Sequence, residues 1–546
     1  MADSSIVKPP LSQGVAYGIV LGFGIVFALT MNLITWISRR FLDESADANM
    51  QLTARNSVKT GLVAAAVVSS WCYAATTLNS VRLTYVYGFA GLWWFVAGAT
   101  VQILLYAIMA IELKRRAPRA NTILEALRIR FGTRTHIVFF VYGVAIQILI
   151  TATLLLGGSA ALNVTTGAST VAMNYLIPLG VVVYTYLGGH KSTFLSDYIH
   201  PWNSGQTVRS LANRCCQNNR IRGQGRVISD HAIGRGSDLG VVILVSGFGS
   251  VFVDTSCGQK AIAGAPTAVV NRYFFGAFAW FSIPLGLCAT MSYVAIALSE
   301  TEYWPVSGGV TSYQINNALI LPLAAEAVMG KGGAAAVILM VFMAVTSSFS
   351  AEIIAHASIV TFDIYQPYIN PTADDKRLRL ISHASLSFFA IFSASFATAL
   401  NASGISMGWI LEFICVVLGA AVISITLAVN SAHVSSMYMY TAAPIGTVCG
   451  LVAWLATTKG MYGEVNVTTT FENWPMFAGS MRPFAAKFDC EHLFLTQAVQ
   501  PRPGDKTFSP GDESDLGGDW DDVARGKDRI LLSWYRRIIM SFLDGG

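Results

Sequence analysis

Long apolar segments dominate the chain, and shorter polar stretches separate them. Eleven such segments lie near residues 14–37, 59–82, 88–111, 136–160, 169–187, 239–256, 270–298, 333–358, 381–400, 407–429 and 442–457. A helix needs about 20 apolar residues to cross the hydrocarbon core of a bilayer, whereas a barrel strand alternates over about ten. The segments are apolar on all sides, so the pattern predicts an all-α polytopic membrane protein.

The composition supports a chain that lies mostly in lipid. Hydrophobic residues make up 53% of the sequence, charged residues only 12%, and the mean hydropathy is +0.53. A soluble protein carries about twice that charged fraction. The net charge of +5 is small and concentrates in alternate loops, so we expect a lipid bilayer and no nucleic acid as partner.

The sequence carries no motif of a pump, an enzyme or a metalloprotein. It contains no GxxxxGK[ST] phosphate loop and no HExxH pair. Its eight cysteines form no CxxC pair or other metal-ligand spacing. The first residues lack the basic region and cleavage site of a signal peptide, so the first apolar segment is expected to remain as a span. We expect a protein that is not an enzyme, with no cofactor and no obligate protein partner.

Basic residues and glycosylation sequons lie in different loops. Lys and Arg cluster after the first, third and eighth segments, whereas sequons at Asn163, Asn401 and Asn466 follow other segments. Cytoplasmic loops carry the excess of Lys and Arg, and sequons mark the outer side. This pattern predicts a multi-pass plasma-membrane protein with an extracellular N-terminus.

The alternation of basic loops with loops on the outer side fails between the fifth and sixth segments. One more span between residues 188 and 240 would restore it, but residues 201–235 are polar and carry six arginines. Each arginine at the bilayer centre costs about 2.5–3.5 kcal/mol. We therefore expect a helix that begins near Ser192 to stop at Pro201, followed by an anomalous polar insert over 201–236. The alternative is an ordinary hydrophilic loop, with the topology argument wrong.

Two of the apolar segments are interrupted by small and polar residues. The second carries Ser69, Ser70 and Trp71, and the sixth contains Gly247, Gly249 and Asp254. Unwound backbone at membrane depth is tolerated where it lines a cavity, and paired interruptions in two halves indicate a transporter binding site near the midplane. The alternative is that the small residues let helices pack closely.

The eighth segment offers three consecutive hydroxyl groups. Thr346, Ser347 and Ser348 fan around a helix and cannot all face lipid. Hydroxyl and carbonyl oxygens are suitable ligands for a small hard cation, although a hydroxyl in a membrane helix often bonds back to the preceding turn. Ionisable residues inside spans are rare and favour function, which gives weight to Asp254 and Glu352.

Several motifs together resemble those of one transporter family. The stretch GGHKSTFLSDYIH resembles the signature of the sodium:solute symporters, and AVTSSFSAEIIAHASIVTFDIYQPYI resembles their eighth core helix. SVFVDTSCGQKAIAGAP, GKGGAAAVILMVFMAVTS and ENWPMFAG are similar to motifs of the urea permeases of fungi and plants. The resemblance covers roughly residues 12–200 and 237–480.

This resemblance implies two inverted five-helix repeats of the leucine-transporter type, with an extra N-terminal helix. The implied organisation is a tail, extra helix and loop (1–56), a first repeat with a truncated fifth helix (57–200), the polar insert (201–236), a second repeat (237–430), an additional helix and outer loop (431–480) and a polar, disordered tail (481–546). The family usually has aromatic residues at Cys257 and Gly258 and continues with further spans after Gly479, and this chain departs from it there.

The resemblance also implies a cation site and a neighbouring substrate site. The implied cation ligands are the backbone carbonyls of Ala65, Val68 and Ala344, the hydroxyls of Ser347 and Ser348, and the acidic residue Asp197. The implied substrate site is bounded by Trp71, Tyr73 and the sixth-segment interruption with Gly247, Gly249 and Asp254, with Gln147 as a further candidate.

The implied function is import of urea, or a similar small polar solute, by symport with H⁺ or Na⁺. Hydroxyl and carbonyl ligands suit sodium, whereas urea permeases of this branch are regarded as proton-coupled, so the sequence leaves the ion open. Two alternatives remain: a symporter of the same fold for a polyamine or an amino acid, and a transport-inactive or sensing relative, because the fifth core helix and the last spans are missing.

Overall fold

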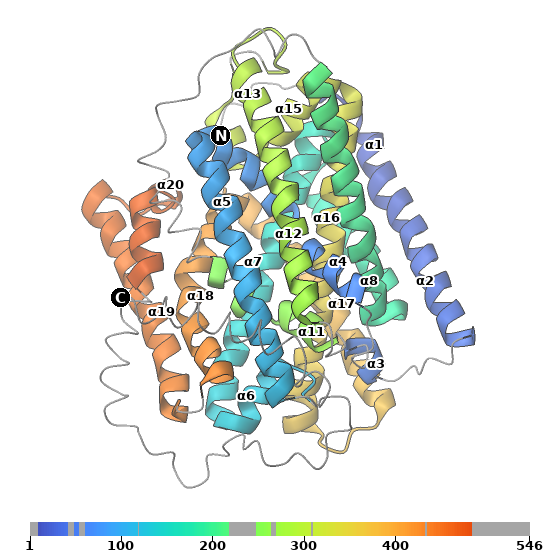
Figure 1. The fold of residues 1–546 in the computed structure, drawn as a ribbon, viewed down its shortest axis with the longest axis vertical. Helices are drawn as coiled ribbons and strands as arrows, with labels where there is room; N and C mark the ends of the chain where they lie inside the picture. Colours follow the sequence, from blue (N-terminus) through green and yellow to red (C-terminus); the bar gives the residue numbers. More distant parts are fainter. Residues whose placement is uncertain are drawn as a thin grey trace. The chain divides into compact units, whose positions relative to one another are not determined.

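The computed structural model of the chain is a bundle of helices (Figure 1). It describes residues 9–41, 48–53, 60–117, 120–217, 247–249, 251–263, 269–306, 309–431 and 434–482, and these ranges contain no strand. Eight helices within them are long and apolar enough to cross a membrane. The predicted all-α membrane fold is therefore confirmed, while the predicted disordered tail lies almost entirely outside the described residues.

The first half of the bundle consists of an additional N-terminal helix and the first repeat. The additional helix is formed by α1 (Gln13–Tyr17), η1 (Gly18–Phe23) and α2 (Gly24–Phe41), and α3 (Ala48–Thr53) follows it. The first repeat comprises α4 (Thr60–Trp71), α5 (Ala74–Arg116), α6 (Ile123–Phe131), α7 (Thr133–Thr166) and α8 (Thr170–Gln217).

Two of these elements each contain two helices joined at a glycine. Gly88 in α5 has φ 63° and ψ −145°, and Gly189 in α8 has φ 56° and ψ −151°. Glycine adopts such positive φ values without the steric cost of a Cβ atom. At Gly189 a Cβ atom would also lie 2.6 Å from the Gln51 carbonyl oxygen. The chain therefore turns at both glycines, and α8 supplies both the fourth and the fifth core helix.

The prediction that the fifth core helix stops at Pro201 is wrong. The helix continues through Pro201 to Gln217. Its buried side chains recur at helical spacing, at Asp197, His200, Ser204, Thr207 and Leu211. Four of these five are polar, so the segment buries one face without showing an apolar run. Arg209 and Arg214 lie on the exposed side. Residues 218–236 of the predicted insert lie outside the described residues.

The second repeat and the helices that follow it complete the bundle. They are α11 (Thr255–Ala263), α12 (Val269–Leu287), η4 (Cys288–Ser292), α13 (Tyr293–Leu298), α14 (Ser312–Asn316), α15 (Ile320–Met329), α16 (Lys331–Ser358), η5 (Ile359–Ile369), α17 (Asp375–Ala402), α18 (Met407–Asn430), α19 (Ser436–Tyr462) and α20 (Val467–Thr470).

Each repeat begins with a broken helix. The first is interrupted at Cys72 and Tyr73, between α4 and α5, and the second at Val253 and Asp254, just before α11. The predicted pair of interruptions is therefore present, a few residues after the positions that the sequence indicated. Irregular backbone at membrane depth is tolerated where it is buried, and Cys72, Val253 and Asp254 at these breaks are buried.

Hydrogen bonds place the basic loops at one end of the bundle. The Ala48 amide donates to Asp375 Oδ1 at 2.6 Å, which joins the start of α3 to the start of α17. Arg116 Nη2 donates to the Asn430 carbonyl at 3.0 Å, which joins the end of α5 to the end of α18. The sequence required one more crossing between residues 188 and 240 for the later basic loops to stay at this end. The second half of α8, the fifth core helix, provides that crossing (Figure 1).

The two repeats run in opposite directions. The first half of the first broken helix, α4, lies between the middle of the bundle and the end that carries α3 (Figure 1). The second half of the second broken helix, α11, lies at that end too, because Lys114 near the end of α5 donates to the Ile262 carbonyl. The first half of the broken helix in the first repeat therefore lies toward the same end as the second half of the broken helix in the second repeat. Two repeats of opposite direction require this arrangement.

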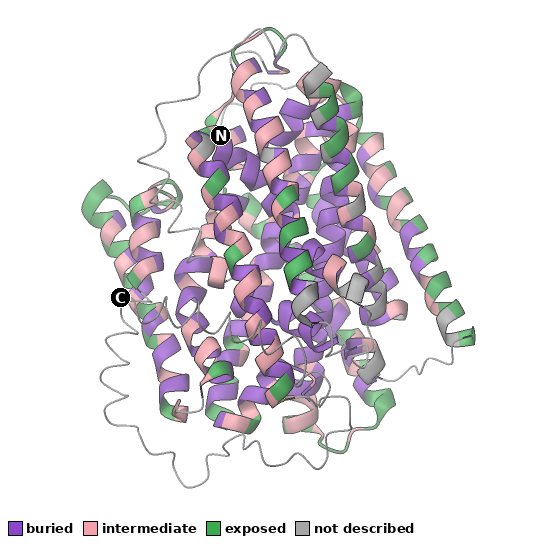
Figure 2. Ribbon diagram, in the orientation of Figure 1, coloured by how far each residue is buried: buried purple, intermediate pink, exposed green. Residues whose placement is uncertain are grey.

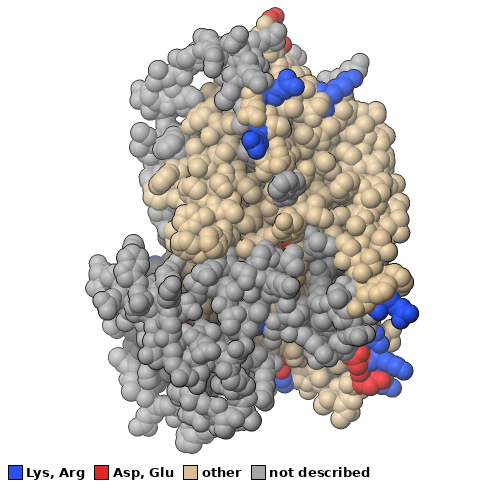
Figure 3. Space-filling model, turned by 45° about the vertical axis from the view of Figure 1, so that its right-hand side comes forward, with Lys and Arg blue, Asp and Glu red and all other residues tan. Residues whose placement is uncertain are grey.

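The outward faces of several helices are apolar. Exposed side chains on α2 and α12 include Leu29 at 65% and Phe275 at 65% exposure, and Phe388 on α17 is 68% exposed. Figure 2 shows these helices with one exposed and one buried face. On the face in Figure 3, Lys and Arg lie toward the two ends of the described surface, and the band between them is largely uncharged. Such a surface suits lipid.

Candidate functional site

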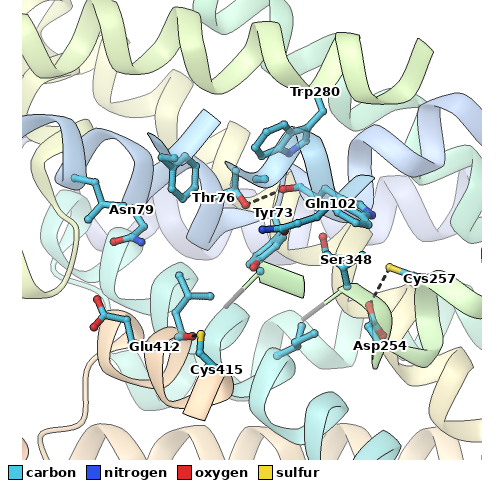
Figure 4. Close-up of a pocket in the computed structure, with 18 of the residues that line it drawn as sticks. Tyr73, Thr76, Asn79, Gln102, Asp254, Cys257, Trp280, Ser348, Glu412 and Cys415 are labelled. Carbon is cyan, nitrogen blue, oxygen red and sulfur yellow. Dashed lines mark hydrogen bonds between the residues drawn. The ribbon is translucent and has the colours of Figure 1, made fainter. Parts of the chain in front are cut away.

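A cavity of about 110 Å³ lies between the two helix breaks (Figure 4). A water molecule needs about 10–15 Å³ of such space, so the cavity admits a solute of several non-hydrogen atoms. Its walls come from both repeats and combine aromatic rings with polar groups. They are Trp71, Tyr73, Thr76, Asn79, Leu83, Phe95, Ala99, Gln102, Ile150, Gly247, Val251, Asp254, Cys257, Trp280, Ser348, Glu352, Leu411, Glu412 and Cys415.

The first helix break provides an aromatic wall with satisfied backbone. Tyr73 has φ −75° and ψ 174°, an extended conformation that starts α5 anew. Thr76 Oγ1 donates to the Trp71 carbonyl at 2.7 Å and so pairs an oxygen that the interrupted helix leaves open. Trp71 and Tyr73 both line the cavity, where the resemblance placed them.

The second break is capped by Asp254. One oxygen of its carboxylate accepts from the Ser256 amide at 2.7 Å, and the other accepts from the Ser256 hydroxyl at 2.7 Å and from Cys257 Sγ at 3.2 Å. This is the geometry of a helix N-cap, which satisfies a free amide at the start of α11. Asp254 also lines the cavity, so both of its carboxylate oxygens already have partners at the cavity wall.

Glu352 is the second acidic wall residue. Its side chain is 3% exposed, and its Oε2 atom has no hydrogen-bond partner among the described residues. A buried carboxylate oxygen without a partner is costly, and such groups are found where a ligand supplies the missing bond. The arrangement provides a hydrogen-bond acceptor for N–H groups inside the cavity.

A cluster of polar side chains lies beside the cavity, between α4, α8 and α16. The Ser347 hydroxyl donates to Asp197 Oδ1 at 2.5 Å and lies 2.5 Å from the Ser69 hydroxyl. Ser69 Oγ also lies 3.1 Å from His200 Nδ1. The Ser348 hydroxyl donates to the Ser69 carbonyl at 3.4 Å. Three residues implied as cation ligands, Asp197, Ser347 and Ser348, are thus brought together.

A lysine occupies this cluster. Lys260 on α11 is 1% exposed, and its Nζ lies 2.8 Å from Asp197 Oδ2 and 3.4 Å from the Ala66 carbonyl oxygen. Both charges of the pair are buried, and the attraction between buried charges in contact offsets much of their desolvation cost. The carboxylate that the resemblance assigned to the coupling ion therefore already faces a side-chain cation.

The remaining predicted residues lie around these two sites. Ala65 and Val68 lie on α4 within one turn of Ser69, and Ala344 lies one turn before Ser348 on α16. The Val68 carbonyl accepts from the Cys72 amide at 2.9 Å. Thr346 bonds back to the Phe342 carbonyl at 2.9 Å, so back-bonding accounts for this hydroxyl of the eighth segment.

Two residues predicted for the substrate site do not line the cavity. Gln147 Nε2 donates to Thr255 Oγ1 at 2.6 Å, and its Oε1 lies 3.2 Å from His356 Nδ1, so Gln147 ties α7 to α11 and α16. Gly249 lies against the backbone of α18, near Gly419. Gly247 does line the cavity, and a Cβ atom there would clash with the side-chain amide of Gln102.

Sequence reasoning missed several residues of the site. Lys260 stands within the quoted motif GQKAIAGAP, and an ionisable residue in an apolar segment was the signal that could have found it. Gln102, Trp280 and Glu412 also line the cavity. These three lie in otherwise ordinary apolar segments, and no local pattern distinguishes Trp280 from a lipid-facing residue.

Comparisons with known proteins place the chain among known transporters. No protein-family model matches the chain. The chain is 40% identical over 499 residues to the "Urea active transporter" of Saccharomyces cerevisiae, covering 87% of this chain and 68% of that protein. It is 37% identical over 511 residues to the "Urea-proton symporter DUR3" of Oryza sativa subsp. japonica, covering 87% of this chain and 70% of that one.

A solved structure confirms the fold. A Na⁺-coupled sialic acid symporter in a substrate-bound, outward-open state matches with a TM-score of 0.67 and 18% identity, over 88% of this chain and 98% of that one. The predicted inverted-repeat fold of the leucine-transporter type is confirmed by this match. The chain is 37–40% identical to urea transporters of two yeasts and rice and covers 68–75% of their length, so it belongs to the urea active transporter family.

Proposed function

We propose that this protein imports urea across the plasma membrane by symport with a proton. Its family membership supports urea as the substrate, since relatives from yeast and rice carry that activity in their names. The observation that carries the proposal is the cavity between the two helix breaks, with aromatic walls and unpaired hydrogen-bonding capacity.

The chemistry of the cavity suits a small neutral amide. Urea offers four N–H donors and one carbonyl acceptor. The Glu352 carboxylate would accept N–H groups, and the side-chain amides of Asn79 and Gln102 would donate to the carbonyl. The rings of Trp71, Tyr73 and Trp280 would cover the faces of the flat solute. A cavity of about 110 Å³ suits a solute of this size.

Coupling between solute and ion would pass through α4 and α16. Ser348 lines the cavity, and its hydroxyl donates to the Ser69 carbonyl. Ser69 Oγ in turn contacts Ser347 and His200 in the polar cluster. A movement of α16 relative to α4 would therefore change the cavity and the cluster together, as alternating access requires.

The orientation follows from loop charge. The end of the bundle that carries α3, α6 and the start of α17 holds the basic loops, and we assign it to the cytoplasm. The N-terminus then lies outside. The inactive or sensing alternative rested in part on a missing fifth core helix, and that helix is present to Gln217.

A direct test is uptake of radiolabelled urea by cells that lack their own urea transporter. Cells with the chain at the surface should accumulate label above cells with empty vector, and unlabelled urea should compete. The three carboxylates at the cavity, from Asp254, Glu352 and Glu412, would also attract a cationic amine. Labelled spermidine should therefore be tested in parallel, and uptake of spermidine with no uptake of urea would favour a polyamine as substrate.

A further inference from the structure

Three asparagines stand in the acceptor pattern for N-linked glycans, and the structure gives them different surroundings. The patterns are Asn163-Val-Thr, Asn401-Ala-Ser and Asn466-Val-Thr. They lie at the ends of α7 and α17 and after the end of α19, and each of these helices runs from the end with the basic loops to the other end (Figure 1). A glycan is bulky and belongs on a surface in contact with water. The surroundings of each asparagine therefore decide whether the folded protein can carry a glycan there.

Asn163 lies in a tight and covered connection. It belongs to the last turn of α7, and only three residues join α7 to α8. Its Nδ2 atom, which would carry the sugar, donates to the Ala168 carbonyl at 2.7 Å. The N-terminal segment packs against this connection, because Gln13 Nε2 donates to the Gly167 carbonyl at 2.8 Å. A glycan at Asn163 would have to displace that segment.

Asn401 is exposed, but it adjoins the apolar part of its helix. It follows the apolar segment 381–400 directly, and a connection of four residues leads from α17 to α18. Its Nδ2 atom donates to Thr170 Oγ1 at 3.0 Å, which ties α17 to the start of α8. The hydroxyl of Ser403, the third residue of the pattern, donates to the Ala399 carbonyl at 2.9 Å. Both groups of this acceptor pattern therefore hold helix ends together near the bilayer.

Asn466 lies farther from the apolar part of its helix. The helix α19 continues five residues past the apolar segment 442–457, to Tyr462, and Asn466 follows four residues later. Asn466, Val467 and Thr468 are all exposed. A glycan at this position would extend into water without displacing a packed group.

The two polar atoms of the Asn466 side chain have separate roles. Its Oδ1 atom accepts from the Thr469 amide at 2.9 Å and caps α20. Its Nδ2 atom lies 3.5 Å from Glu464 Oε2, at the limit of a hydrogen bond. Attachment of a sugar changes the nitrogen and leaves the carbonyl oxygen able to accept. The cap and the glycan are therefore compatible.

We propose that the protein carries an N-linked glycan at Asn466 and none at Asn163 or Asn401. This inference goes beyond the proposed function and shares with it only the orientation, which places this end of the bundle outside. In the transfer, the Asn466 amide nitrogen forms a bond to the anomeric carbon of a lipid-linked pyrophosphoryl oligosaccharide. The bond from that carbon to the pyrophosphate oxygen breaks, the lipid pyrophosphate leaves, and the nitrogen loses one proton. The cell that makes the protein supplies the oligosaccharide.

The test follows the mobility of the full chain in gel electrophoresis, after expression in a eukaryotic host. Treatment with peptide N-glycosidase should move the parent to one faster band. Two variants, Thr468→Ala, which breaks the pattern, and Asn466→Asp, which keeps the capping oxygen, should run at the faster position without treatment. Asn163→Gln and Asn401→Gln are the matched controls and should shift as the parent does.

A second variant tests the orientation on which the inference depends. The sequence Asn370-Pro-Thr lies just before α17, at the end with the basic loops, and Pro371 and Thr372 are exposed. A proline in the middle position blocks the acceptor pattern, so Pro371→Ala completes the pattern at the opposite end of the bundle from Asn466. This variant should show the mobility of the parent before and after treatment. An additional shift would place the basic loops outside and overturn the inference.

The outcomes separate this inference from the proposed function. A parent that shows no shift, or a shift that is lost in Asn163→Gln or in Asn401→Gln, would overturn the inference, whatever the urea uptake of the same cells. A parent that is glycosylated at Asn466 but takes up no urea would remove the proposed function and leave the inference intact.

Should the variants fail to reach the surface, peptide mass spectrometry of the treated parent decides. The glycosidase converts a glycosylated asparagine to aspartate. We expect this conversion at position 466, and conversion at position 163 or 401 instead would overturn the inference.

Discussion

The hydroxyl oxygens of Ser69 and Ser347 lie 2.5 Å apart and join the first helix of one repeat to the third helix of the other. Ser69 lies three residues before the break at Cys72, and Ser347 lies next to Ser348, a residue of the cavity wall. The contact therefore stands between the solute cavity and the polar cluster that contains Asp197 and Lys260.

The first prediction concerns the Ser347 hydroxyl. Ser347→Ala removes a hydrogen bond to the Asp197 carboxylate, and a bond to a charged group contributes about 1.5–3 kcal/mol. Without this bond the negative charge of the carboxylate is less well stabilised and a proton binds beside it more tightly, so we expect the proton concentration for half-maximal urea uptake to fall about tenfold, measured as uptake against external pH at matched surface levels. Ser350→Ala is the control, since Ser350 is equally buried and donates to the Ser347 carbonyl. Identical pH profiles for the two variants would remove Ser347 from the ion site.

A second prediction concerns the cap at the second helix break. Asp254→Asn keeps a side-chain oxygen that can accept from the Ser256 amide, whereas Asp254→Ala loses the cap. We expect the alanine variant to unfold at lower temperature, by a loss of about 1 kcal/mol, and the asparagine variant to remain near the parent. Because the asparagine variant removes a charge near Lys260, its pH profile of uptake should shift. A parental pH profile would make Asp254 a structural cap alone.

The third prediction concerns Glu352, whose replacement should stabilise the protein and weaken urea binding. Its Oε2 atom is buried and has no partner among the described residues, and a neutral amide costs less to bury than a carboxylate. We expect Glu352→Gln to raise the melting temperature in detergent and to raise the KM for urea about tenfold, because one charge-assisted hydrogen bond is lost. Glu326→Gln on α15, outside the cavity lining, should leave KM unchanged. An unchanged KM in Glu352→Gln would exclude Glu352 from urea binding.

The fourth prediction tests the fifth core helix. Gly205 lies in α8 beyond Pro201 and is exposed, and a Cβ atom added there would have nothing within 4 Å. Alanine is favoured over glycine in a helix by about 1 kcal/mol, so Gly205→Ala should be neutral or stabilising. Gly205→Pro should reduce surface expression sharply, since proline breaks a helix interior. Equal expression of both variants would indicate a loop at this position.

The contrast between the breaks and the fifth helix shows what hydropathy can predict. Glycine, serine and acidic residues inside apolar segments mark unwound backbone, and both breaks lie close to those residues. The fifth helix was missed because Ser204 and Thr207 occupy its buried face, where an apolar run was expected. Small hydroxyl side chains pack well between helices, and their helical spacing was the available signal.

The candidate site was predictable to a similar extent. The signature acid Asp197 and the pair Ser347 and Ser348 were found from their motifs, and the structure brings them together. Their partner Lys260 comes from a helix more than sixty residues away in sequence, and only the packing of α11 against α4 and α16 places it beside Asp197. Local patterns carry no information about such a tertiary pairing.

The most direct test of the account is the urea accumulation ratio in proteoliposomes that contain the purified protein. The lumen is made alkaline relative to the outside, sodium is absent, and labelled urea is measured at steady state. We predict that urea inside exceeds urea outside, that a protonophore abolishes the excess, and that an inward sodium gradient at equal pH produces none. Accumulation driven by sodium alone, or equal urea on both sides under a proton gradient, would contradict the account.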